Sequence, residues 1–478
     1  MSAKKFLCIT LVLALMVFAF SGCGGSSHNN LGSNNNNEQQ EQEQQQDNQQ
    51  EQQQDQNQDQ QQENQQDQDQ NDNDDDNADD NADDNTGDDN NDDASDYDYS
   101  STTAGENAIL ADGEDESYSD VTVYKSGNYS GSEEADFYGT NAAILALNGA
   151  TLTLSGITVT TEGSYANGVF CYGGSSSSNG GAPAMPGRIS ATGDGSTVNI
   201  SDSKITTSSN NSGGIMVTGG GVLTASNLTI TTSGGSSAAI RSDRGGGTMT
   251  VKGGTYTTSG KGSPAIYCTA DISVSDATLK STTAQGVVIE GKNSVTLNDC
   301  AMTVDNTTIN GSQSTRKQAV MIYQSGSGDA STGKGEFDMS GGSITNNTGD
   351  IFYITNTTAE IDLSGVTITN NDSSGVFLRA ELAGWSTTNG GTVELTADNQ
   401  TITGDFVIDS ASSLTLELED SSTMTGAINT ANSGASVSVS IEAGSTWTLT
   451  GNSYVTSLTN NGTINQGSYT LYVNGTAY

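Results

Sequence analysis

The stretch Thr197-Val198-Asn199-Ile200 alternates polar and apolar residues, and similar stretches return about every two dozen residues from residue 120 to the end. The repeats include Met249-Thr250-Val251, Ile272-Ser273-Val274, Val295-Thr296-Leu297, Phe337-Asp338-Met339 and Ile361-Asp362-Leu363. Such alternation is typical of a strand with one buried face. A fixed period of this size indicates a solenoid of stacked coils, in which each coil contacts only its neighbours, rather than a globular core.

Each repeat contains two further short apolar stretches. Thr229-Ile230-Thr231 represents the second stretch, and Gly286-Val287-Val288-Ile289 represents the third. The second also recurs as Lys204-Ile205-Thr206, Thr255-Tyr256-Thr257, Thr278-Leu279-Lys280, Thr303-Val304-Asp305 and Thr367-Ile368-Thr369. Three strands per coil, parallel from coil to coil, predict an all-β fold: a right-handed parallel β-helix of about a dozen coils, with ladders of Val, Ile and Leu in a narrow core.

The N-terminus has the features of a secretory signal. Lys4 and Lys5 precede an apolar run that ends in Phe20-Ser21-Gly22-Cys23, and the run is too short to span a bilayer. Small residues before a cysteine resemble a bacterial lipobox, which implies a signal peptide at 1–22 and a diacylglyceryl lipid on Cys23. The alternative is an ordinary signal peptide with a chance cysteine. The lipid would place the protein on the bacterial surface, at the outer membrane where the cell has one and otherwise on the outer face of the cell membrane.

Residues 23–102 are predicted to be a disordered acidic tether, since Gln, Asn and Asp dominate and apolar residues are nearly absent. Diffuse attraction of cations by runs such as Asp74-Asp75-Asp76 is the alternative role for this segment. We expect the β-helix at 103–412, followed at 413–478 by terminal coils and a cap that shields the last edge. The formal net charge of −43, with only 15 Lys and Arg, disfavours a nucleic-acid binder, which needs clustered basic residues.

Three cysteines remain in the predicted β-helix, namely Cys171, Cys268 and Cys300. Cys171 and Cys268 fall about three coils apart in the repeat, which is too far for a disulfide. We therefore expect free cysteines packed within the coils.

Extra residues interrupt the period at 172–190, at 306–335 and at 379–391, mostly after the third strand of a coil. Insertions in solenoids tend to map to one face, which is often the binding face. These insertions bring Tyr172, Tyr323, Arg379 and Trp385, whose side chains suit stacking on sugars or pairing with their carboxylates. Surface loops without a role are the alternative.

The end of the third strand is also unusually charged. We use the name charged stripe for the candidate ligand-binding residues there: Arg241, Asp243, Arg244, Asp271, Glu290, Lys292, Tyr323, Gln324, Arg379 and Trp385. An arginine pair can hold a carboxylate through two parallel hydrogen bonds, so an acidic sugar or a peptide carboxylate is the predicted ligand. The alternative is a structural network of salt bridges at a strand corner.

Three other functions would use these or neighbouring residues. If the chain is similar to the lyases of the pectate-lyase fold, this resemblance implies Arg244 or Lys292 as the base and Ca²⁺ on Asp243, Asp271 and Glu290. A hydrolase of the kind found on this fold needs several Asp residues and a histidine, but the only histidine is His28 and no Asp-Asp pair occurs within the coils. Ice binding by the Thr-x-Thr ladder is countered by Lys204, Lys280 and Asp305, which interrupt it, and strand propensity alone explains the threonines.

The stretches Asp136-Phe137-Tyr138-Gly139, Ser237–Arg244, Glu290–Ser294 and Ser445–Gly451 resemble a group of secreted, adhesin-like β-helix proteins of gut anaerobes. The resemblance covers most of residues 103–478 and implies a pectin-lyase-like fold at the cell surface. It carries no catalytic residues or cofactor with it.

Together these features predict a monomeric surface lipoprotein that meets the membrane through Cys23 and binds a glycan or another ligand on a host or neighbouring cell. A lyase acting on acidic glycans and a passive spacer are the alternatives.

Overall fold

The computed structural model describes residues 96–174, 193–309 and 316–478. The chain divides into two units, 1–74 and 75–478, and all described residues belong to the second. The predicted signal peptide, Cys23 and most of the predicted tether lie outside the described residues.

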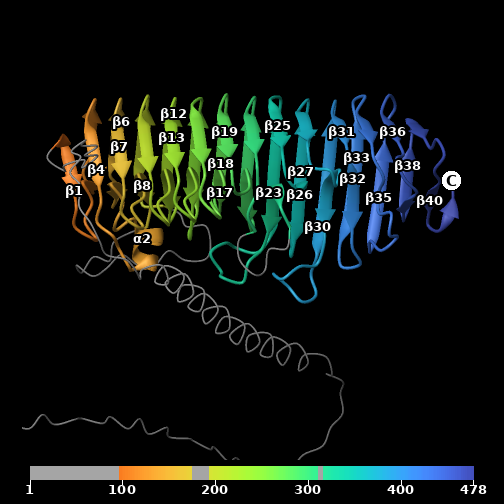
Figure 1. Cartoon of the computed structure of the whole chain (residues 1–478), viewed down its shortest axis with the longest axis horizontal. Helices are drawn as coiled ribbons and strands as arrows, with labels where there is room; N and C mark the ends of the chain where they lie inside the picture. Colours follow the sequence, from red (N-terminus) through yellow and green to blue (C-terminus); the bar gives the residue numbers. More distant parts are fainter. Residues whose placement is uncertain (1–95, 175–192, 310–315) are drawn as a thin grey trace, which may run out of the picture. The chain divides into compact units, whose positions relative to one another are not determined.

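Three long parallel sheets, here called A, B and C, pass through the successive coils (Figure 1). Successive strands along the chain go to different sheets, and strands of neighbouring coils pair in parallel, as Ile205 pairs with Val159 on one side and Ile230 on the other. Sheet A has 10 described strands, sheet B has 11 and sheet C has 13. The predicted all-β parallel β-helix, with three strands per coil and about a dozen coils, is confirmed.

The strands of sheet A are β1 (Tyr99–Ser101), β4 (Thr122–Lys125), β7 (Thr158–Thr161), β10 (Lys204–Thr207), β13 (Thr229–Thr232), β16 (Thr255–Thr258), β19 (Thr278–Ser281), β22 (Ala301–Val304), β25 (Ser343–Asn346) and β28 (Thr367–Asn370). Those of sheet B are β2 (Ile109–Asp112), β5 (Ile144–Leu147), β8 (Val169–Tyr172), β11 (Ile215–Thr218), β14 (Ile240–Ser242), β17 (Ile266–Cys268), β20 (Val287–Glu290), β23 (Gln318–Tyr323), β26 (Asp350–Thr355), β29 (Val376–Ala380) and β32 (Asp405–Ile408). Those of sheet C are β3 (Glu116–Ser119), β6 (Thr151–Ser155), β9 (Thr197–Ser201), β12 (Gly221–Ser226), β15 (Gly247–Lys252), β18 (Asp271–Ser275), β21 (Ser294–Asn298), β24 (Lys334–Ser340), β27 (Thr357–Ser364), β30 (Gly391–Asp398), β33 (Ser413–Glu419), β35 (Ser436–Ile441) and β38 (Ser457–Asn460).

Two small sheets complete the C-terminal coils. Sheet D contains β31 (Thr401–Thr403), β34 (Thr423–Thr425), β36 (Thr446–Thr448) and β39 (Thr463–Asn465), and sheet E contains β37 (Ser453–Val455), β40 (Leu471–Val473) and β41 (Thr476–Ala477). Every pair of neighbouring strands in the described residues is parallel except β40 and β41, which run antiparallel at the end of the chain.

The core consists of the inward residues of all three faces. Alternation decides which residues these are, so that Val198 and Ile200 are buried while Asn199 between them faces outward. Stacking also places like residues together. The rings of Phe337, Phe352, Phe377 and Phe406 follow one another with centroid distances of 5.5, 5.5 and 5.4 Å. Cys171, Cys268 and Cys300 are buried and free, as predicted.

Two expectations about the coils need correction. The β-helix begins before residue 103, because β1 already pairs with β4 through Tyr99 and Val123. The predicted second strand Thr303-Val304-Asp305 is out of register by two residues. The strand residues that pair with Thr278-Leu279-Lys280 are Ala301-Met302-Thr303. Asp305 therefore lies beyond the strand and does not interrupt the threonine ladder. Met302 and Val304 are both apolar and two residues apart, so the sequence fits either register equally well.

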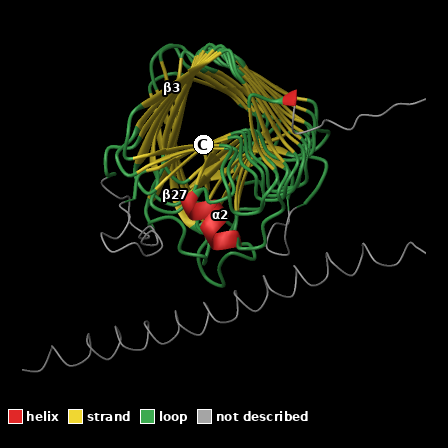
Figure 2. Cartoon of the chain, turned by 90° about the vertical axis from the view of Figure 1, so that its left-hand side faces the viewer, coloured by secondary structure: helices red, strands yellow, loops and turns green. Residues whose placement is uncertain are grey.

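One helix departs from the predicted all-strand pattern. Helix α2 (Ser132–Tyr138) lies in the connection between β4 and β5 and ends at Gly139, whose φ of 70° is left-handed. A side chain at Gly139 would also come within 2.7 Å of the Phe170 ring. The view along the stacked coils shows α2 outside the ring of strands (Figure 2).

Helix α2 covers part of the outer face of sheet B. Its Phe137 and Tyr138 pack on Phe170, Tyr172 and other outward residues of sheet B. The connection at 324–333, between β23 and β24, and the connection at 381–390, between β29 and β30, follow strands of the same sheet. These two connections therefore follow the third strand of a coil, on one face, as the breaks in the period predicted. Most of the third insertion, 172–190, lies outside the described residues.

Candidate functional site

Arg241 and Asp243 of the charged stripe lie together on the outer face of sheet B. Arg241 in β14 faces outward, and its Nη2 lies 2.9 Å from Asp243 Oδ2 and 3.1 Å from Asp136 Oδ1 of α2. The side chains of these residues are 11%, 8% and 16% exposed, so the charges are largely shielded from water. An arginine between two carboxylates is a site already filled by the chain itself.

Arg244 makes the second such contact. Its Nε and Nη2 donate to Asp329 Oδ1 at 3.0 and 2.6 Å, and its guanidinium lies 4.1 Å from the centre of the Phe137 ring. Asp329 belongs to the 324–333 connection, whereas Phe137 belongs to α2. Arg244 thus joins two insertions that are almost two hundred residues apart in sequence, and we call α2 together with residues 324–333 the roof.

Three carboxylates share these two arginines, and the pKa values reflect their crowding. Burial raises the pKa of Asp243 to about 7 and raises that of Asp136, while Arg241 acts in the opposite direction on both. The charge of Asp329 acts in the same direction as burial on both pKa values. The cluster is therefore a strongly coupled network that depends on each arginine.

Glu290 forms a neighbouring cluster of hydroxyl groups. Its carboxylate accepts hydrogen bonds from Tyr267 at 2.6 Å, from Tyr323 at 2.9 Å and from Ser325 of the roof. Burial raises the pKa of Glu290, and the three hydroxyl donors oppose that change. Gln324 is buried beside this cluster and donates to the Ser325 carbonyl at 3.2 Å.

Trp385 and Arg379 lie further along the same face. The Trp385 ring lies 4.7 Å from the Tyr323 ring and is half-buried in an apolar cluster with Met321 and Tyr353. Arg379 donates to Asp350 at 2.7 Å. The stripe thus divides into an arginine cluster, a Glu290 cluster and the Arg379–Asp350 pair.

Two residues of the stripe lie apart from these clusters. Asp271 is exposed at the start of β18 in sheet C and accepts a hydrogen bond from Ser294 at 2.9 Å. Lys292 is exposed, and its backbone N–H donates to the Ser331 carbonyl at 2.7 Å. The calcium site of the lyase alternative is therefore not assembled: Asp243, Asp271 and Glu290 are separated, and among the described residues no group of three or more His, Cys, Asp or Glu could hold a metal ion.

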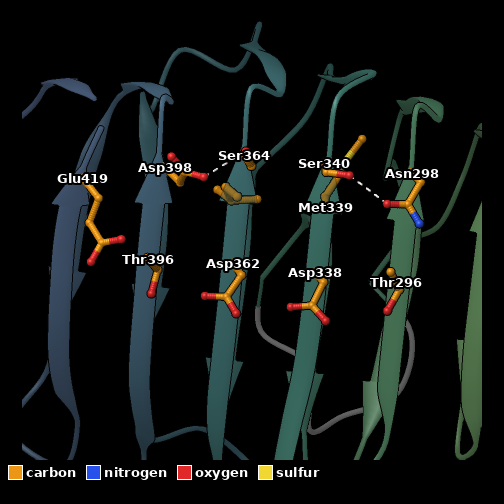
Figure 3. Close-up of a pocket in the computed structure, with 11 residues that line it drawn as sticks. Thr296, Asn298, Asp338, Met339, Ser340, Asp362, Ser364, Thr396, Asp398 and Glu419 are labelled. Atoms are coloured by element: carbon orange, nitrogen blue, oxygen red, sulfur yellow. Dashed lines mark hydrogen bonds between the residues drawn. The ribbon is translucent and has the colours of Figure 1, made fainter. Parts of the chain in front are cut away.

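A hollow of about 350 Å³ lies elsewhere, on the outer face of sheet C. Figure 3 shows outward side chains of five neighbouring strands, β21 to β33, lining it in rows. One row contains Thr296, Asp338, Asp362 and Thr396, and a second contains Asn298, Ser340, Ser364, Asp398 and Glu419. Ser340 donates to Asn298 at 2.7 Å, and Ser364 donates to Asp398 at 3.3 Å.

The central feature of the hollow is a pair of carboxylates. Asp338 and Asp362 are direct partners in the parallel pairing of β24 with β27. Partial burial, together with the charge of the adjacent Asp362, raises the pKa of Asp338 to about 6. The sequence of the coils contains no adjacent Asp-Asp pair, but parallel stacking forms one across two strands from residues that the sequence separates.

The acidic character extends beyond the hollow. Glu336, Glu360 and Glu394 form a third row on the same strands, and Lys334 binds both Glu336, at 3.2 Å, and Glu360. The face therefore presents carboxylates, hydroxyls and one amide, and it repels an anionic ligand.

Because the folded-state pKa of Asp338 is raised above 3.8, the native chain holds an extra proton between about pH 4 and pH 6. The stability that protonated Asp338 contributes to the fold is thus present at low pH and is lost as the pH rises through 6. We expect Asp338→Asn to raise the melting temperature at pH 7, measured by circular dichroism. The decrease in melting temperature as the pH rises from 4 to 7 should be smaller in this variant than in wild type. Asp276→Asn, an exposed change at a turn, should leave the curve as in wild type. An unchanged curve in Asp338→Asn would contradict the prediction.

Sequence reasoning missed the residues that complete both regions. Asp136 and Asp329, which meet arginines of the stripe, come from insertions outside the repeat. Asp350, the partner of Arg379, lies on β26, which pairs with the strand of Arg379. The Asp338–Asp362 pair had a signal, since each residue holds the same place in consecutive first strands, Phe337-Asp338-Met339 and Ile361-Asp362-Leu363.

In the described part of the chain, no helix has the length and apolar character needed to cross a membrane. No protein-family model, curated protein or solved structure matches the chain.

Proposed function

We propose that the chain is a bacterial surface lipoprotein whose β-helix binds a hydroxyl-rich, non-acidic glycan in the hollow of sheet C. The N-terminal signal and Cys23 support the surface location, as argued from the sequence. The observation that supports the binding site is the hollow itself, a recess lined by rows of outward polar side chains on strands of one rigid sheet. Binding there would attach the cell to the glycan, which is the adhesive role expected from the sequence.

The lining favours sugars for a chemical reason. Sugar hydroxyls donate to carboxylates, and such charge-assisted hydrogen bonds are about twice as strong as neutral ones. Thr296, Thr396 and Ser364 can both donate and accept, and Asn298 adds an amide. The carboxylates repel uronic acids and sulfated sugars, so the ligand class shifts from the acidic glycan expected from the sequence to neutral or amino sugars.

A glycan array with purified protein tests this proposal. We expect saturable binding to neutral or amino-sugar glycans, with at least a tenfold loss of affinity in the double variant Asp338→Ala/Asp362→Ala. Each lost hydrogen bond to a charged group is worth about 1.5–3 kcal/mol, and about 1.4 kcal/mol is tenfold. Asp276→Asn should bind like wild type. Binding that survives the double variant would place the site elsewhere, and an array without any binding would favour a passive spacer.

The Asp338–Asp362 pair supports one second candidate, hydrolysis of a glycosidic bond. Two neighbouring carboxyl groups, one of which has a raised pKa as Asp338 does, can serve as acid and base. New reducing ends from the bound glycan, lost in Asp338→Asn, would identify an enzyme. Arg244 is a poor candidate for the base of the lyase alternative, since it is held by Asp329 and Phe137.

A further inference from the structure

The arginines of sheet B and the carboxylates that neutralise them come from different parts of the architecture. Arg241, Asp243 and Arg244 belong to one coil, at β14 and the residues after it, whereas Asp136 and Asp329 belong to the roof. Without the roof, this part of the coil would carry two guanidinium groups and one carboxylate. It would then attract anions, unlike the acidic face of sheet C.

The groups under and beside the roof suit a saccharide. Tyr267, Tyr323 and Glu290 offer two rings and a carboxylate, and Trp385 adds a further ring beside Tyr323. Near the roof, the buried donors Arg241 Nη1 and Trp385 Nε1 are among those without a hydrogen-bond partner in the described residues. Unsatisfied buried donors are costly, so a ligand that supplies acceptors there gains their pairing energy.

The loop of the roof is attached through few side chains. Residues 325–328 read Ser-Gly-Ser-Gly. Within the loop, Asp329 binds Arg244, Ser325 binds Glu290, and the Ser331 carbonyl accepts from the Lys292 N–H. At the two ends of the loop, the carbonyls of Gln324 and Gly333 accept from the side chains of Asn356 and Thr357. Glycines permit a large change of backbone angles at little steric cost. The Arg244–Asp329 contact is therefore the main charged tie that a competing carboxylate must replace.

We propose that the outer face of sheet B holds a second binding site, for a carboxylate-bearing saccharide, and that Asp136 and Asp329 of the roof occupy it as internal carboxylates. A ligand carboxylate takes the place of Asp329 on Arg244, the 324–333 loop lifts, and the sugar ring reaches Tyr267, Tyr323 and Trp385. One carboxylate replaces another on Arg244, so the ion pair of Arg244 is kept. The free-energy cost of lifting the loop therefore comes from the other contacts that the loop loses. This site is independent of the hollow in sheet C.

Titration calorimetry with trigalacturonate, and with a neutral galactose trisaccharide as control probe, tests the proposal. We expect Asp329→Ala to bind trigalacturonate at least tenfold more tightly than wild type, because the competing internal carboxylate is gone. The gain in affinity should be lost in Asp329→Ala/Arg244→Ala. When Asp276→Asn or Asp338→Ala/Asp362→Ala is added to Asp329→Ala, the gain in affinity should remain. The last variant separates this result from the fate of the proposed function.

Two results would overturn the proposal. One is equal or absent trigalacturonate binding in wild type and Asp329→Ala, and the other is equally tight binding of the neutral trisaccharide. If Asp329→Ala folds poorly, Asp329→Asn keeps the volume and removes the charge, and the same comparison applies. Addition of galacturonate, but not galactose, should then raise the melting temperature of the Asp329 variant, and no such difference would likewise count against the site.

Discussion

Arg241→Ala is expected to lower the free energy of unfolding by about 3–5 kcal/mol, the usual cost of breaking a buried ion pair from one side. The substitution leaves Asp136 and Asp243 close together and largely shielded from water, with their common partner removed. Their mutual repulsion adds to the cost of desolvating each of them. Urea denaturation followed by circular dichroism measures the change.

The pH dependence of this variant provides an internal control. Without Arg241, protonation is the only way to neutralise the two aspartates, so the loss should shrink as the pH falls toward 4. Lys204→Ala, which removes an exposed cation on sheet A, should change stability by no more than about 0.5 kcal/mol. A loss below about 1 kcal/mol in Arg241→Ala would mean that the arginine cluster contributes little to the fold.

Phe377→Ala is expected to cost about 3–5 kcal/mol, because it opens a cavity in the middle of a row of phenyl rings. Phe377 is fully buried, with Phe352 at 5.5 Å on one side and Phe406 at 5.4 Å on the other. Both neighbours lose an aromatic contact, and a rigid stack of coils collapses poorly into the vacant space. Phe377→Leu, which keeps most of the volume, should cost less than about 1.5 kcal/mol.

The place of the Phe377 effect is as informative as its size. Each coil of a solenoid contacts only its neighbours, so destabilisation can remain local. Hydrogen exchange in Phe377→Ala should therefore accelerate first in β26, β29 and β32, while β8 and β11 keep the protection seen in wild type. Uniform acceleration along the whole chain would instead indicate that the coils unfold as one unit.

The repeat made the coils predictable because one rule decides most of their residues. Alternation in Thr197–Ile200 fixes which side chains enter the core, and parallel stacking repeats that choice in each coil. The rule is weak where apolar residues are two apart, as at Met302 and Val304, since a shift by two residues keeps the same face buried. It also fails in insertions, where no periodic neighbour constrains the chain.

The two candidate regions illustrate the two limits of sequence reasoning. The Asp338–Asp362 pair follows from the register, so careful stacking of the repeats was sufficient to find it. The pairing of Arg244 with Asp329 does not, because a contact across 85 residues between an insertion and a coil corner has no counterpart in neighbouring repeats. The salt-bridge network that the sequence left as the alternative for the stripe therefore includes partners, such as Asp329, that the repeat does not indicate.

The antiparallel pairing of β41 with β40 has a consequence for contacts between molecules. Parallel coils end in a row of backbone donors and acceptors that matches the first coil of another copy, which invites end-to-end polymerisation. β41 runs opposite to the coils, so a coil of another copy in the same orientation would meet β41 antiparallel and would not continue the parallel ladder. The β40–β41 pair thus limits growth of a continuous parallel ladder from this edge of sheet E.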